Sequence, residues 1–258
     1  MKERLKVGST SVWGEDGEKA FLFVTGMAID ADGSPHAYNP TNTGLDYLAN
    51  AGRPGNWWGI VTDTGKSDGK PVVQTSTDPA AGYYVSSTSL ADPHYTRIQQ
   101  RHYVDSETIP FIVLPLDVIR ATGITLGDFG LATHVTSGKQ CFVIFADGGP
   151  AGKIGEGSIA LASALGVASS PKRGGTSSRV IAYLAFPGSG TRLPVPAATI
   201  DAKGAAALTA FGGPARLHAW MAAIPTPLQG SGHSDVRRRG PVHRPSLREI
   251  EACYPRST

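Results

Sequence analysis

Hydrophobic residues in this chain gather in short runs bounded by Gly, Pro, Asp or Ser, a pattern typical of β-strands. Seven such runs stand out, at residues 21–29, 58–62, 71–74, 109–114, 130–135, 141–146 and 180–186. The intervals between them are irregular and mostly too short for one helix each, which argues against repeated βαβ units. The pattern therefore predicts a mainly β fold, a barrel or a sandwich, of which we favour a barrel-like core.

Few segments show the spacing of an amphipathic helix. Four short helices are predicted, at residues 43–51, 116–121, 157–165 and 201–211. In the third, Ile159, Ala162 and Leu165 recur at helical intervals before Gly166 ends the pattern. The fourth is Ala-rich and closes with two glycines, which favour a helix C-terminus.

Charge divides the 258 residues into two parts. Between residues 226 and 258, six Arg stand against three acidic residues, so this segment accounts for the whole net charge of +3. We predict a neutral main domain over residues 1–225 and a basic Pro/Gly/Arg-rich tail over residues 226–258. The run Arg237-Arg238-Arg239 could touch nucleic acid or an anionic surface, but a solvated terminus is the simpler interpretation. We expect no nucleic-acid partner.

The sequence offers little for a metal or an organic cofactor. The seven His residues never fall into the spacing of a zinc site, and the two Cys residues, 141 and 253, cannot form a disulfide framework. The glycine-rich stretch before Lys153 lacks the Ser or Thr that a phosphate loop needs, because Ile154 follows the lysine. We predict a monomer with no metal and no cofactor.

No apolar run reaches the length of a membrane span, and no apolar segment follows the charged start of the chain. We therefore expect no membrane association and no signal peptide within this chain. That expectation fits a cytoplasmic protein, export without such a signal, or a mature fragment.

Two acidic residues flank one glycine-rich loop. Asp147 follows the apolar run 141–146, and Glu156 comes nine residues later, at the start of the predicted helix. Hydrolysis of a glycosidic bond needs such a pair, one carboxyl group protonated and one ionised. The structural alternative is that Glu156 favours a helix N-terminus and Asp147 ends a strand in a turn.

Several segments, taken in order, resemble the glycoside hydrolase family 75 chitosanases over about residues 20–190. They are Gly26-Met27-Ala28-Ile29-Asp30-Ala31-Asp32-Gly33, Asn42-Thr43-Gly44-Leu45-Asp46, Tyr103-Val104-Asp105-Ser106, Ile109-Pro110-Phe111-Ile112-Val113-Leu114-Pro115, Phe145-Ala146-Asp147 and Ile154-Gly155-Glu156-Gly157-Ser158. The resemblance implies an endo-acting hydrolase that cleaves the β-1,4 links of chitosan with inversion, using Asp147 and Glu156.

The same resemblance implies a secreted, extracellular enzyme of polysaccharide degradation, and analogy with small glycanases suggests a double-psi type of barrel. Fungal members have a longer loop with more than one Asp and are richer in Cys. This chain has Asp147 alone in that loop and no disulfide pattern, so it resembles a bacterial-type member.

A carboxylate at a helix N-terminus is stabilised when ionised, which favours Glu156 as general base and Asp147 as general acid, although the reverse assignment stays open. Asp30 and Asp32 would complement the cationic amines of chitosan, or they form a solvated turn. Tyr38, Trp58 and Tyr84 are candidate platforms for sugar rings.

Two other functions compete with this interpretation. The first is hydrolysis of peptidoglycan, which is also a β-1,4 hexosamine polymer. The second is a carbohydrate-binding protein that keeps the groove but has no catalytic activity.

Overall fold

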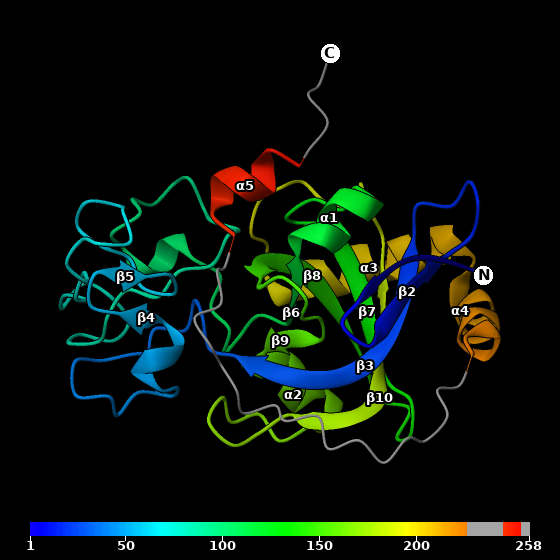
Figure 1. Cartoon of the computed structure of the whole chain (residues 1–258), viewed down its shortest axis with the longest axis horizontal. Helices are drawn as coiled ribbons and strands as arrows, with labels where there is room; N and C mark the ends of the chain where they lie inside the picture. Colours follow the sequence, from blue (N-terminus) through cyan, green and yellow to red (C-terminus); the bar gives the residue numbers. More distant parts are fainter. Residues whose placement is uncertain (226–244, 254–258) are drawn as a thin grey trace.

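The computed structural model describes residues 1–225 and 245–253, and its centre is a barrel (Figure 1). Six strands close the ring in the order β3-β10-β7-β8-β6-β9 and back to β3. Their bounds are β3 Phe21–Asp30, β6 Phe111–Pro115, β7 Phe129–His134, β8 Gln140–Gly149, β9 Glu156–Ser158 and β10 Thr176–Ala185. The β3–β9 and β6–β8 pairs are parallel and the other pairs antiparallel. The predicted mainly β fold with a barrel core is confirmed, and the double-psi type stays a prediction.

Alternation along β3 separates the inside of the barrel from its outer face. Phe21, Phe23, Met27 and Ile29 belong to the main hydrophobic core. Leu22 faces the other way and joins a second cluster, beneath the helices α3 (Ala197–Phe211) and α4 (Gly213–Ala223). Successive side chains of a strand project to opposite faces, so both faces of this part of β3 are covered.

The sequence patterns missed three strands of the eight-stranded sheet that contains the barrel. β1 (Lys2–Val7) and β2 (Thr10–Gly14) form a hairpin that extends the sheet from β3. Only Val7 is buried in β1, so that strand has no apolar run. β9 has three residues and contains a glycine, which leaves no periodic signal.

Three of the four predicted helices are present. α1 covers Leu116–Thr122, α2 covers Ile159–Leu165, and the predicted helix 201–211 lies within α3. α2 begins two residues later than predicted, because Ser158 caps it by accepting a hydrogen bond from the Leu161 amide.

The predicted helix at residues 43–51 is wrong, since only the 3-10 turn η1 (Leu48–Asn50) forms there. Asparagine side chains take up the backbone amides instead. Asn39 accepts from the Thr43 amide at 2.9 Å, and Asn42 accepts from the Leu48 amide at 2.7 Å. Such local bonds compete with a helix.

Residues 31–110, which we call the lobe, lie to one side of the barrel between β3 and β6 (Figure 1). Regular structure in the lobe is limited to η1, the hairpin β4 (Gly52–Arg53) and β5 (Asn56–Trp57), and the turn η2 (Gln100–His102). The predicted strands 58–62 and 71–74 are wrong as continuous strands. Their residues make isolated bridges, such as Ile60 with Ser86 and Thr62 with Pro71.

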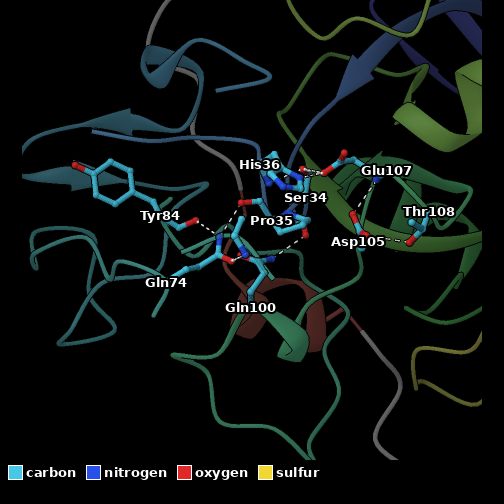
Figure 2. A network of polar contacts seen from close by, with 11 residues as sticks. Ser34, Pro35, His36, Gln74, Tyr84, Gln100, Asp105, Glu107 and Thr108 are labelled. Carbon is cyan, nitrogen blue, oxygen red and sulfur yellow. Dashed lines mark hydrogen bonds and ion pairs between the residues drawn. The ribbon is translucent and has the colours of Figure 1, made fainter. Parts of the chain in front are cut away.

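Buried amide side chains hold the lobe together (Figure 2). Gln74 donates to the carbonyl oxygens of Pro35 at 2.7 Å and Tyr84 at 3.1 Å. Gln100 donates to the carbonyl oxygens of Gly33 at 2.8 Å and Ser86 at 3.0 Å. These bonds join backbone segments that are far apart in the chain. The segments are not joined to one another by the ladder of backbone hydrogen bonds of a β-sheet.

Part of the predicted tail is described. Helix α5 (Leu247–Glu251) packs beside α1, and Ile250 is fully buried in the main core (Figure 1). The rest of the tail, residues 226–244 and 254–258 with the run Arg237-Arg238-Arg239, lies outside the described residues. The domain boundary at 225 stays a prediction. Within the described part of the chain, no helix combines the length and the apolar character that a membrane span needs.

Candidate active site

Strand register places Asp147 and Glu156 on one face of the barrel wall. Val113 on β6 is in register with Asp147 on β8 at one side and with Glu156 on β9 at the other. Residues in register on neighbouring strands project to the same face, so both acidic side chains lie on the face of Val113. Two strand spacings separate their Cα atoms, a distance of about 9.5 Å.

Glu156 lies on β9, in register with Ala28 of the parallel strand β3, and is half-buried. The backbone before it needs a glycine, because Gly155 has φ +98° and a Cβ there would lie 2.9 Å from the Gly26 carbonyl oxygen. The expectation that Glu156 begins a helix is wrong, since Ser158 is the N-cap of α2. The helix-dipole argument for Glu156 as the base therefore falls away.

Asp147 is nearly buried, 5% exposed, and is held by the lobe. Both the backbone amide and the hydroxyl of Ser89 donate to Asp147 Oδ1, at 2.8 and 2.6 Å. The Gly148 amide in turn donates to Ser89 Oγ at 3.1 Å. Ser89 thus fixes the orientation of the Asp147 carboxyl group. Sequence reasoning missed it, because nothing distinguishes Ser89 among the Ser and Thr residues around it.

Two further predicted residues join Asp147. Carboxyl oxygens of Asp30, Asp32 and Asp147 lie within 4.8 Å of one another, and all three residues are buried. Asp30 Oδ1 accepts from the Asp32 amide at 2.9 Å, and Asp32 Oδ1 accepts from the Tyr38 hydroxyl at 2.6 Å. We call Asp30, Asp32 and Asp147 the acid cluster.

The chemistry of the acid cluster follows from its crowding. Buried carboxylates at this separation repel one another, so the cluster favours retaining a proton. Carboxylate oxygens are also suitable ligands for a hard cation such as Ca²⁺ or Mg²⁺. The expected absence of a metal stays a prediction.

The candidate aromatic platforms differ in exposure. Tyr38 is buried, and its hydroxyl is engaged with Asp32. Trp58 and Tyr84 are half-buried, and the Trp58 indole donates to the Asn50 carbonyl oxygen at 2.8 Å. The Tyr84 ring points away from the amide network around Gln74 (Figure 2).

A second polar cluster lies within the lobe and joins its first residues to the segment just before β6 (Figure 2). Glu107 Oε1 accepts from the Ser34 hydroxyl at 2.6 Å and lies 2.8 Å from His36 Nδ1. Nearby, burial raises the pKa of Asp105 above its usual range. Asp105 also lines a cavity of about 290 Å³ between the lobe and the barrel, where burial raises the pKa of Tyr103 to about 12.

Comparison with known families assigns residues 57–211, more than half of the chain, to the family described as fungal chitosanase of glycosyl hydrolase group 75. The matched range contains Ser89, Asp147 and Glu156 and begins after Asp30 and Asp32. No curated protein matches the chain.

Proposed function

Because the chain belongs to glycosyl hydrolase group 75 and is a glycoside hydrolase of the chitosanase type, we propose that it cleaves internal β-1,4 links of chitosan with inversion, using Asp147 and Glu156. The observation that carries the proposal is the shared register of these two residues with Val113. It brings to one face two acids from separate strands.

Inversion requires room for a water molecule between the sugar and the base. Inverting glycosidases hold their two carboxyl groups about 6.5–9.5 Å apart, whereas retaining enzymes hold them about 5–5.5 Å apart. Two strand spacings, about 9.5 Å between Cα atoms, favour the longer separation. A nucleophilic carboxylate on a strand directly adjacent to the acid would favour the shorter one.

In the proposed reaction the acid donates its proton to the glycosidic oxygen as the bond from that oxygen to C1 breaks. The base removes a proton from a water molecule whose oxygen forms the new bond to C1 on the opposite face. One water is consumed, the acid is left ionised and the base protonated. Proton exchange with solvent restores both groups.

Surroundings favour Asp147 as the acid and Glu156 as the base. Asp147 shares a buried site with Asp30 and Asp32, where mutual repulsion favours a retained proton. The two bonds from Ser89 favour the charged form, and we propose that the repulsion among three carboxylates is the larger effect. Glu156 is half-buried, which gives water access to its carboxylate. The assignment keeps the roles that the sequence suggested but rests on a different physical cause.

Substrate recognition would come from both parts of the molecule. The negative charge of the acid cluster is complementary to the cationic amines of chitosan. Chitin is uncharged and would gain no such electrostatic attraction. Trp58 and Tyr84 would contact sugar rings, while Tyr38 would orient Asp32 through the 2.6 Å hydrogen bond. Chitosanases of this family are extracellular, and we extend this location to the present chain.

The test is release of reducing ends from chitosan, chitin and peptidoglycan by the wild type, Asp147→Asn and Glu156→Gln. We expect cleavage of chitosan alone and a loss of about 10²- to 10⁴-fold in each variant, the usual contribution of a general acid or base. Asp16→Asn, an exposed residue in the turn after β2, is the matched control and should keep full activity.

Other outcomes would support the rival functions. Cleavage of peptidoglycan but not chitosan would retain the chemistry and refute the substrate. Binding of chitosan with no cleavage by the wild type would make the chain a binding protein.

Azide separates the two roles, because this small nucleophile needs no base. Azide should restore turnover of Glu156→Gln, giving a glycosyl azide, and leave Asp147→Asn inactive. The opposite result would exchange the acid and the base.

A further inference from the structure

Helix α5 lies outside the range matched by the family, yet its Ile250 packs against Gly148, the residue that follows Asp147. Ile250 is fully buried in the main core. Its Cδ1 atom, together with the ring of Pro245, covers Gly148 so closely that no side chain fits there. A Cβ on Gly148 would lie 2.9 Å from Pro245 Cγ and closer still to Ile250.

The backbone that Ile250 covers also orients Asp147. The Gly148 amide donates to Ser89 Oγ at 3.1 Å, and the Ser89 hydroxyl donates to Asp147 Oδ1 at 2.6 Å. A shift of Gly148 therefore changes the direction in which Ser89 presents its proton. Contact with Ile250 limits that shift, because close-packed interiors transmit displacement.

Helix α5 is too short to be stable alone, so its fold depends on docking. A capping box closes its first turn, with Ser246 accepting from the Glu249 amide and Glu249 accepting from the Ser246 amide at 2.7 Å. The cap fixes the five-residue helix with Ile250 facing the barrel.

We propose that Ile250 is a positioning residue for Asp147, acting through Gly148 and Ser89. The inference rests on the proposed function, in which Asp147 exchanges a proton with the substrate. It makes α5 a support for the active site in addition to a cover for the core.

The first test compares Ile250→Ala with Ile200→Ala. Ile200, on α3, is the matched control because it is also fully buried in the main core. Both variants should lose thermal stability. Below both melting temperatures, only Ile250→Ala should lower kcat on chitosan, by about tenfold to a hundredfold, with KM unchanged within twofold.

Milder variants guard against a failure to fold. Ile250→Val keeps most of the contact and should restore kcat to within about threefold of the wild type, since one methyl group is removed. Ser246→Ala loosens the helix without altering the core and should lower kcat in the same direction as Ile250→Ala, but less.

A second measurement does not need activity. We would follow the Asp147 carboxyl carbon by NMR during a pH titration, with Asp30 and Asp32 as the titrating groups that face it. In Ile250→Ala the midpoint should move to higher pH, because weaker bonds from Ser89 favour the charged form less. Ile200→Ala should titrate as the wild type does.

The outcomes separate the two claims. If wild-type protein cuts no chitosan, the proposed function fails while the titration still tests the contact between Ile250 and Asp147. If Ile250→Ala and Ile200→Ala have equal kcat and equal Asp147 titrations, α5 has only a structural role and the inference is overturned.

Discussion

The interior of the barrel and the interior of the lobe differ in the side chains that stabilise them. Inside the barrel, strands are joined by backbone ladders around a core of aliphatic and aromatic residues. Inside the lobe, Gln74 and Gln100 are nearly as buried, at 3% exposed each, and they bond to carbonyl oxygens of separate loops. Apolar packing dominates the barrel, whereas the lobe combines a small apolar cluster, which includes Tyr38, Trp57 and Ile60, with these directional hydrogen bonds.

Asp147, one of the two proposed catalytic residues, lies where these two regions meet. The barrel supplies Asp147 and Glu156 from β8 and β9, and the lobe supplies Ser89, which holds Asp147. The barrel strands thus set the separation of Asp147 and Glu156, while the lobe, through Ser89, orients the carboxyl group of Asp147. We therefore expect substitutions in the barrel core to lower the stability of the whole protein, and substitutions in the lobe to affect mainly the lobe.

The largest loss of stability should come from Phe145→Ala. Phe145 is fully buried in the barrel core, and removal of such a ring costs about 3–5 kcal/mol. Urea denaturation should show one cooperative transition at a lower midpoint, affecting barrel and lobe together. A cost below about 1 kcal/mol would mean that the barrel is not the main source of stability.

A smaller and local loss should follow Gln100→Leu. The change leaves the Gly33 and Ser86 carbonyl oxygens, and the Ser86 amide, without the bonds that Gln100 now makes. We expect a cost of about 1–3 kcal/mol. Hydrogen exchange should quicken in the lobe and stay unchanged in β7 and β10.

The control for that experiment is Gln99→Ala, which removes an exposed neighbouring glutamine. It should leave exchange in the core of the lobe unchanged. Equal acceleration of exchange in the barrel and the lobe by Gln100→Leu would show that the lobe opens only when the barrel unfolds, against the contrast drawn here.

The smallest effect should be a pH dependence of the lobe. Burial raises the pKa of Asp105, so the folded lobe holds this proton more tightly than the unfolded chain does. Stability from this group is present at low pH and falls as pH rises from about 4 through the folded pKa. Asp105→Asn should flatten that dependence, as measured by hydrogen exchange in the lobe between pH values of about 4 and 7.

Asp68→Asn serves as the comparison, because Asp68 is an exposed carboxylate of the same lobe. It should retain the wild-type pH profile. If it flattens the profile as much as Asp105→Asn does, the burial of Asp105 is not the cause.

Sequence patterns predicted the barrel better than the lobe, for a physical reason. Apolar runs such as 21–29 and 141–146 report burial directly, and they became β3 and β8. In the lobe, Gln74 and Gln100 hold together segments that carry no periodic pattern. An isolated glutamine gives no sign in the sequence that it will be buried.

The same limit applies to the site. The nine-residue spacing and the glycine-rich loop pointed to Asp147 and Glu156, but their alignment depends on Val113, far away in the chain. Non-local pairing of this kind cannot be inferred from local spacing. Nor could the sequence connect Ile250 with Gly148, which meet only because α5 docks on the barrel.

The most direct test of the central claim is the anomeric form of the first product. NMR spectra recorded in the first minutes of chitosan cleavage, before mutarotation, should show the α-anomer at the new reducing end, and Asp147→Asn and Glu156→Gln should produce almost none. A β-anomer from the wild type would mean retention, and full activity in either variant would exclude that residue from the acid/base pair. Either result would contradict the proposal that Asp147 and Glu156, on the two strands beside β6, cleave chitosan with inversion.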